Sequence, residues 1–193
     1  NNSDNPVCKY LKDINIPFFR GSEDNVLERY YLTALNFESD AIIRITSDCP
    51  LIDPSLIDEF IEEFERLISL KSVDYLSNKI NPTYPIGQDI EIFTFETLKK
   101  SYQNADKKYQ FEHVTPYIYE NQNKFKVYNM AFSKDLSNVR MTLDTKEDLM
   151  FIRALYRHFN RIDFGLLEIL DYLNKNPEIR ELNSHVRQKK YYE

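Results

Sequence analysis

Two aspartates in this sequence occupy positions at which a carboxylate could bind a divalent cation. Asp48 follows a β-branched run at residues 41–46, and after a turn the chain enters a helix with Asp53 as its N-cap and Pro54 in its first turn. In open α/β sheets, ligands bind outside the carboxyl ends of the strands, where Asp48 would lie. The alternative is that Asp48 is a turn residue, since aspartate side chains often bond nearby backbone in turns.

Asp144 repeats this arrangement. It follows the apolar run at residues 139–143, and the segment TKED at residues 145–148 then matches a capping box before the next helix. If both strands are parallel, Asp48 and Asp144 meet at one edge of the sheet, and two oxygen ligands there suit Mg²⁺, which shares its other positions with water and phosphates. Alternatively, Asp144 only caps the helix or forms a salt bridge.

Three further polar residues are candidates for the functional site, and each of them also has a purely structural interpretation. His113 titrates near neutrality, so it is a base, a hydrogen-bond donor, or simply a helix residue. Asp89 begins a strand and is either a substrate ligand or a turn cap. Arg44 faces away from its isoleucine neighbours and could pair with Asp48 or Asp40.

The elements around these residues alternate between strand and helix. Strands are expected at residues 16–19, 41–46, 73–76, 89–95, 125–132 and 139–143. Helices are expected at residues 5–12, 27–35, 55–69, 96–104, 109–120 with a break near Pro116, 149–159, 164–174 and 177–182. The alternation predicts an α/β fold with a mainly parallel sheet and helices on both faces, in which residues 89–95 and 125–132 can add antiparallel strands. We expect one α/β domain at residues 1–160 and a C-terminal helical extension at residues 161–193.

Composition narrows the class of protein. The chain has 193 residues, and its share of hydrophobic residues, 42%, is ordinary for a soluble protein. Its formal net charge of −6 argues against a broad nucleic-acid-binding surface. It contains no apolar run of about 18 residues that would span a membrane. Cys8 and Cys49 belong to no Cys/His cluster, so zinc is not expected and both fit reduced thiols of a cytoplasmic protein. Cys49 has no evident base and is expected to pack in the core.

Six segments carry a resemblance to a known family. They are, in chain order, FRGSEDNVLERY, IRITSDCPLIDP, DYLSN, TYPIGQDIEIF, EHVTPYI and TLDTKEDL. Together they closely resemble the cytidylyltransferases of the spore-coat polysaccharide biosynthesis protein F type, which are relatives of the CMP-Kdo and CMP-sialic acid synthetases. The resemblance extends from about residue 16 to residue 189.

The resemblance implies a GT-A-like nucleotidyltransferase fold and a Mg²⁺-dependent reaction, in which CTP and a sugar or sugar acid give a CMP-sugar and pyrophosphate. It also implies a homodimer. Asp48 and Asp144 match the family's metal-binding acids, and Asp89 and His113 match polar positions that face the sugar pocket. The residues matching the loop and helix start near the nucleotide are Arg20, Ser22, Asp24 and Arg29, and we add Arg44 as a substrate-binding candidate.

One family feature is missing from this sequence. Members carry an upstream strand and a Gly-rich basic loop of the type QARMGSTRLPGK, whose backbone N–H groups cradle the triphosphate. The chain begins at Asn1 without this loop and has only three glycines. We therefore expect an N-terminal segment to have been removed or omitted, and residues 1–193 alone to have little activity. The alternatives are a nucleotide- or sugar-binding module without turnover, and a GT-A glycosyltransferase, which the lack of a DxD pair disfavours.

Overall fold

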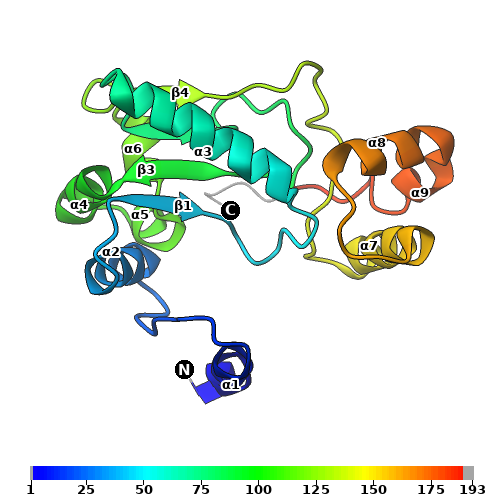
Figure 1. The fold of residues 1–193 in the computed structure, drawn as a ribbon, viewed down its shortest axis with the longest axis horizontal. Helices are drawn as coiled ribbons and strands as arrows, with labels where there is room; N and C mark the ends of the chain where they lie inside the picture. Colours follow the sequence, from blue (N-terminus) through cyan, green and yellow to red (C-terminus); the bar gives the residue numbers. More distant parts are fainter. Residues whose placement is uncertain (1, 189–193) are drawn as a thin grey trace.

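The computed structural model describes residues 2–188 and contains a four-stranded sheet (Figure 1). The strands are β1 (Ala41–Arg44), β2 (Tyr75–Ser77), β3 (Glu91–Thr94) and β4 (Val127–Asn129), in the order β1-β3-β2-β4. β3 runs antiparallel to both of its neighbours, and only β2 and β4 pair in parallel. The predicted mainly parallel sheet is therefore corrected to a mixed sheet.

The reversal of β3 follows from its connection to β2. A parallel crossover usually contains a helix, and residues 78–90 form an irregular loop with Pro82, Pro85 and Gly87 instead. Two predicted strands do not form. Residues 16–19 are irregular, and at residues 139–143 only Arg140 pairs, in an isolated parallel bridge to Ile86. Val139 and Met141 of this second segment are buried by packing rather than by joining the sheet, whereas Leu143 is exposed.

The predicted helices are all present in residues 2–188, with ends that differ by a few residues. The predicted helices are α1 (Asn5–Asp13), α2 (Val26–Asn36), α3 (Pro54–Ser69), α4 (Phe95–Asn104), α5 (Lys108–His113), α6 (Pro116–Glu120), α7 (Lys146–Phe159), α8 (Leu166–Lys175) and α9 (Pro177–Glu181). A 3₁₀ helix at Asn2–Asp4 was not predicted. The predicted break near Pro116 is confirmed, since α5 and α6 are separated by Val114, which has a φ of 72°, and Thr115. No helix in this described part is long and apolar enough to cross a membrane.

Helices cover both faces of the sheet, as predicted. Because side chains alternate along a strand, Leu76 and Ile92 point to one face and Tyr75 and Phe93 to the other. The first pair packs in a core with residues of α3, α7 and α8. The second pair packs in a separate core with residues of α2, α4 and α6. The sheet is thus a rigid layer between two cores, and the loops at its ends are free to carry function.

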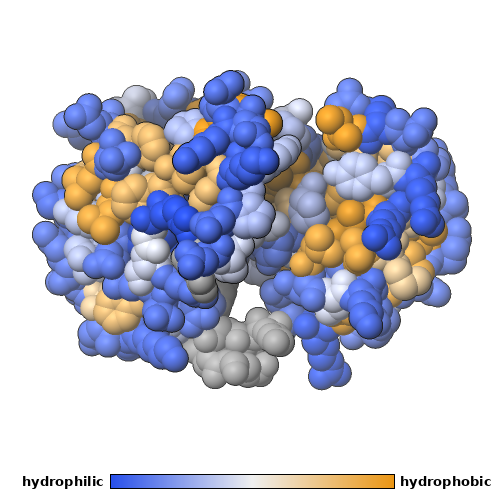
Figure 2. All heavy atoms as spheres, turned by 90° about the horizontal axis from the view of Figure 1, so that it is seen from below, coloured by the Kyte–Doolittle hydropathy of each residue, from blue (hydrophilic) through white to orange (hydrophobic). Residues whose placement is uncertain are grey.

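The molecule has two halves of unequal type. The sheet with α2 to α6 forms one half, and α7 to α9 gather at the other side (Figure 1). Seen from below, the surface is hollowed between the two halves (Figure 2), although residues of α7 and α8 share one core with the sheet. The loops that leave β1 and enter α7 lie between them in Figure 1, which places both candidate acids in this region.

Candidate functional site

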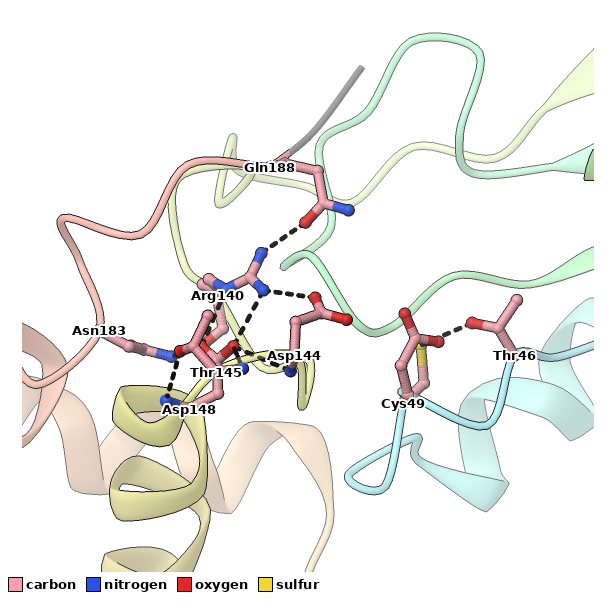
Figure 3. A network of polar contacts seen from close by, with 9 residues as sticks. Thr46, Cys49, Arg140, Asp144, Thr145, Asp148, Asn183 and Gln188 are labelled. Carbon is pink, nitrogen blue, oxygen red and sulfur yellow. Dashed lines mark hydrogen bonds and ion pairs between the residues drawn. The ribbon is translucent and has the colours of Figure 1, made fainter. Parts of the chain in front are cut away.

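The two candidate acids lie on neighbouring loops. We call residues 45–53 the Asp48 loop and residues 141–145 the Asp144 loop. The backbone N–H of Leu143 donates a hydrogen bond to the carbonyl oxygen of Asp48 (2.8 Å). Asp48 is half-buried, whereas Asp144 keeps 43% of its side chain exposed and points toward the loop that carries Thr46 and Cys49 (Figure 3). The structure therefore brings together the two loops that carry these aspartates.

A buried segment between β2 and β3 holds both loops. Gln88 donates from Nε2 to the carbonyl oxygen of Leu51 (2.6 Å), and its Oε1 accepts from the N–H of Asp53 (3.0 Å). Gly87 has a φ of 98°, and a Cβ there would lie 2.7 Å from the carbonyl carbon of Met141. Only glycine allows this approach, so the pair Gly87-Gln88 fixes the spacing of the Asp48 loop and the Asp144 loop.

An ion-pair network lies behind Asp144. Arg140 donates from Nε and Nη2 to the two oxygens of Asp148 (2.9 and 3.0 Å), and Nη2 also donates to Asp144 Oδ2 (2.5 Å). Asp148 Oδ2 accepts the backbone N–H groups of Asp144 and Thr145 (3.0 Å each). Burial alone would raise the pKa of Asp148, but Arg140 and the other donors hold it well below its usual value. Asp148 is thus an anion that organises the Asp144 loop.

Glu91 on β3 forms a second buried network. Its carboxylate pairs with Arg44 of β1 and accepts hydrogen bonds from the hydroxyls of Tyr75 (2.6 Å) and Thr115 (2.6 Å). Burial alone would raise the pKa of Glu91, but the charges of Arg44 and its neighbours lower it below the ordinary value. Arg44 therefore pairs with Glu91 rather than with Asp48 or Asp40, the partners expected from the sequence.

Asp89 and His113 lie close to these charges. Asp89 pairs with Lys79 (3.2 Å). His113 is half-buried, and this burial, with the charges of Arg44 and Lys79, lowers its pKa against an opposing effect of Glu112. The imidazole is therefore mostly neutral at pH 7 and able to accept a proton.

Cys49 behaves as a packing residue, as expected. It is 4% exposed, and its thiol contacts Thr46 Oγ1 (3.3 Å) and Asp48 Oδ1 (3.7 Å). Burial, together with the charges of Asp48 and Asp89, raises the pKa of this thiol to about 12. Cys49 thus stays protonated and uncharged at neutral pH and is not a nucleophile.

The four residues assigned to the nucleotide gather around the start of α2. Arg20 Nη1 donates to Asn5 Oδ1 (2.8 Å), and Arg29 Nη1 donates to the carbonyl oxygen of Ser22 (3.1 Å). Ser22 Oγ accepts the N–H of the α2 N-cap residue (2.9 Å), and Asp24 is exposed. These contacts are local to the turn and to α1, so the assignment to a nucleotide stays a prediction.

The donor set at Asp48 and Asp144 fits Mg²⁺ better than a transition metal. No group of three or more His, Cys, Asp or Glu residues suited to a metal occurs within residues 2–188. Two carboxylates and no thiolate match a hard cation that completes its coordination with water and phosphate oxygens.

Several residues of these networks were missed from the sequence. They are Lys79, Gln88, Glu91, Arg140 and Asp148. Glu91 and Arg140 both interrupt apolar runs, which was the available signal for a buried charge. The capping box already explained Asp148, so its pairing with Arg140 was not predicted. The same carboxylate caps α7 and binds Arg140.

A sheet covered by helices on both faces, with two carboxylate loops meeting at its end, is compatible with nucleotidyl transfer. The model of the Cytidylyltransferase family matches residues 2–191, and the chain belongs to this family. The predicted resemblance is thereby confirmed.

Three relatives support the assignment. The chain is 41% identical over 192 residues to an uncharacterized protein of Methanocaldococcus jannaschii, covering 98% of this chain and 76% of that protein. It is 32% identical over 170 residues to the spore coat polysaccharide biosynthesis protein SpsF of Bacillus subtilis, covering 83% and 65% respectively. A solved structure of a cytidylyltransferase from Leptospira borgpetersenii matches with a TM-score of 0.89 at 31% identity, covering 98% and 78%. The chain thus spans about two thirds to three quarters of these relatives.

Proposed function

We propose that this protein transfers a cytidylyl group from CTP to a hydroxyl of a sugar or sugar acid, releasing pyrophosphate, in surface polysaccharide biosynthesis. Family membership and the likeness to SpsF support nucleotidyl transfer in this setting. The single observation that carries the proposal is the 2.8 Å bond between Leu143 and Asp48, because it brings two carboxylate loops to one place. A GT-A-like fold, a homodimer and a cytoplasmic location are further parts of the proposal.

In this proposal Asp48 and Asp144 hold Mg²⁺. The ion, when bound, neutralises phosphate charge and orients the reactants. The hydroxyl oxygen of the acceptor forms a bond to the α-phosphorus of CTP, and the bond from that phosphorus to the bridging oxygen breaks, so that pyrophosphate leaves. The neutral imidazole of His113 accepts the hydroxyl proton, and the Asp89–Lys79 pair positions the sugar. Arg44 supports this part of the site through its ion pair with Glu91, which begins β3 two residues after Asp89.

The turn before α2 is the proposed nucleotide side of the site, with Arg20, Ser22, Asp24 and Arg29. A positively charged pair and backbone groups near a helix start suit phosphate or ribose oxygens. We propose little turnover for residues 1–193 alone, because they contain no Gly-rich basic loop of the family type, and the tests therefore use the complete gene product.

The test is pyrophosphate release by the complete gene product with Mg²⁺, each of the four nucleoside triphosphates, and a panel of sugars and sugar acids. CTP with one class of acceptor should give both pyrophosphate and a CMP-sugar by mass spectrometry. Asp48→Asn should lower kcat/KM by about 100-fold or more, the usual cost of losing one stabilising group at a reacting centre.

The matched control is Asp58→Asn, since Asp58 is an exposed acid on α3. This variant should keep wild-type kcat/KM, and both variants should keep the wild-type melting temperature within a few degrees. Equal activity of Asp48→Asn and wild type, or binding of CMP-sugar without any pyrophosphate release from CTP, would contradict the proposal. The second result would instead identify a binding module.

A further inference from the structure

The chain after α9 returns to the Asp144 loop. Asn183 is 2% exposed, and its Nδ2 donates to Asp148 Oδ1 (2.9 Å) and to the carbonyl oxygen of Arg140 (3.2 Å). Five residues further on, Gln188 Oε1 accepts a hydrogen bond from Arg140 Nη1. Figure 3 shows Gln188 approaching Arg140 from above and Asn183 approaching Asp148 from the left, both from the C-terminal segment. Two side chains of the helical extension therefore belong to the surroundings of a candidate metal ligand.

Arg140 is at the centre of these contacts, and each of its three nitrogens has a partner. Nε and Nη2 bind the two oxygens of Asp148, Nη1 binds Gln188, and Nη2 also binds Asp144. The guanidinium is planar and its donors diverge in fixed directions, so binding Asp148 and Gln188 sets the direction of the remaining contact to Asp144. A lysine has one charged nitrogen and cannot make the same set of contacts.

The orientation of Asp144 depends on this arrangement more than on packing. Its side chain is 43% exposed, whereas the side chain of Arg140 is 4% exposed. Arg140 holds Oδ2 at 2.5 Å, and Asp148 holds the backbone N–H at 3.0 Å. The other carboxylate oxygen of Asp144 is turned toward the loop that carries Cys49 (Figure 3). Asp48 precedes Cys49 in this loop. An exposed aspartate without such a partner would sample several rotamers.

We propose that Arg140 is a positioning residue for the divalent cation, and that Asn183 and Gln188 extend its support to the C-terminal segment. This inference rests on the proposed function of the same site. Groups that orient a metal ligand typically contribute about 10- to 100-fold to metal affinity. The helical extension then does more than pack beside the sheet, since it completes the surroundings of Asp144.

A purely stabilising network is the competing explanation, and metal affinity separates the two. The experiment titrates Mn²⁺ into the complete gene product with CTP present and follows free Mn²⁺ by electron paramagnetic resonance. Gln188→Ala removes an exposed side chain, so it should leave the melting temperature near that of wild type while raising the Kd for Mn²⁺ by several fold. Gln188→Glu keeps an acceptor oxygen for Arg140 Nη1 and should restore wild-type affinity. Arg140→Lys should raise the Kd by about 10- to 100-fold.

The matched control for the segment is Ser184→Ala. Ser184 is exposed and its hydroxyl donates to the carbonyl oxygen of Glu181 (3.4 Å), away from the Arg140 contacts, so this variant should bind Mn²⁺ as wild type does. Wild-type affinity in Gln188→Ala and Arg140→Lys would overturn the inference, even if Arg140→Lys lowers the melting temperature. If wild type binds Mn²⁺ with CTP but releases no pyrophosphate, the proposed reaction fails while the positioning role stands. If wild type binds no Mn²⁺, both fail.

Discussion

Glu91 on β3 carries a buried negative charge next to the candidate site. It is 2% exposed and accepts hydrogen bonds from three side chains, Arg44, Tyr75 and Thr115, which come from two strands and a loop. A buried charge is stable only when it is paired and hydrogen-bonded, and here the partners provide both. Removing the charge of Glu91 leaves the cation of Arg44 buried without its partner.

Glu91→Gln should therefore lower the free energy of unfolding at pH 7 by about 3 kcal/mol, as is typical when one member of a buried pair is lost. The folded state lowers the pKa of Glu91 below its ordinary value of 4.5. The ion pair thus contributes fully above that value, and its contribution is lost as the pH falls through the folded-state pKa. The difference between wild type and Glu91→Gln should shrink in acid.

Urea unfolding at pH 7 and at several values below pH 4.5 measures this difference. The control is Glu63→Gln, because Glu63 pairs with Arg66 on the exposed face of α3 and should change stability little. A difference for Glu91→Gln that is small at pH 7, or that persists undiminished in acid, would show that Glu91 is not a stabilising anion.

Single residues differed in how well they could be predicted. Asp48 and Asp144 follow an apolar run and precede a helix cap, and this local pattern is sufficient to place them at the ends of elements. Glu91 interrupts an apolar run, but this signal was ambiguous, because its alternation with Ile90 and Ile92 is also the pattern of a strand with one face in water. Both faces of β3 are covered by helices, and only the folded sheet reveals that.

At the scale of elements, Asp53 joins two helices that are far apart in sequence. Its Oδ1 accepts the N–H of Ser55 at the start of α3 (2.9 Å), and its Oδ2 accepts the N–H of Leu166 at the start of α8 (2.7 Å). One carboxylate therefore satisfies orphan backbone donors of both helices and favours both dipoles. The sequence predicted the first cap but had no means of showing the second.

A graded pair of substitutions tests this double role. Asp53→Asn keeps one acceptor oxygen and should cost about 1 kcal/mol, whereas Asp53→Ala loses both caps and should cost about 2 kcal/mol. Chemical denaturation gives both values, and hydrogen exchange of the Ser55 and Leu166 amides shows which cap each variant retains. Equal stability of Asp53→Ala and wild type would mean that neither cap matters.

Elements were predicted with uneven success for physical reasons. Helices such as α3 have a clear apolar stripe and a cap, which are local features. Residues 139–143 have the composition of a strand, but their backbone contacts the Gly87 segment at one bridge and otherwise packs as an irregular chain. The direction of β3 likewise depends on its partners, so the mixed sheet was not evident from any one segment.

At the scale of the whole molecule, the candidate site is assembled from distant parts of the chain. The Asp48 loop leaves the sheet, the Asp144 loop precedes α7, and Asn183 and Gln188 approach from beyond α9 (Figure 3). The repeated pattern of an apolar run, an acid and a capped helix predicted that Asp48 and Asp144 belong together, and the resemblance to a family supported this pairing. The third segment has no local signal, because an asparagine and a glutamine after a helix are common in any surface loop.

The most direct test of the central claim, that Asp48 and Asp144 serve one metal and nucleotide site, is a double-mutant cycle on kcat/KM for pyrophosphate release from CTP. Asp48→Asn and Asp144→Asn should each reduce kcat/KM by about 100-fold or more. The double variant should have a kcat/KM only slightly below that of the less active single variant, because the effects of two groups that act as one unit are not additive. Losses that multiply, to about 10,000-fold or more in the double variant, would show that the two carboxylates act independently and would contradict the account.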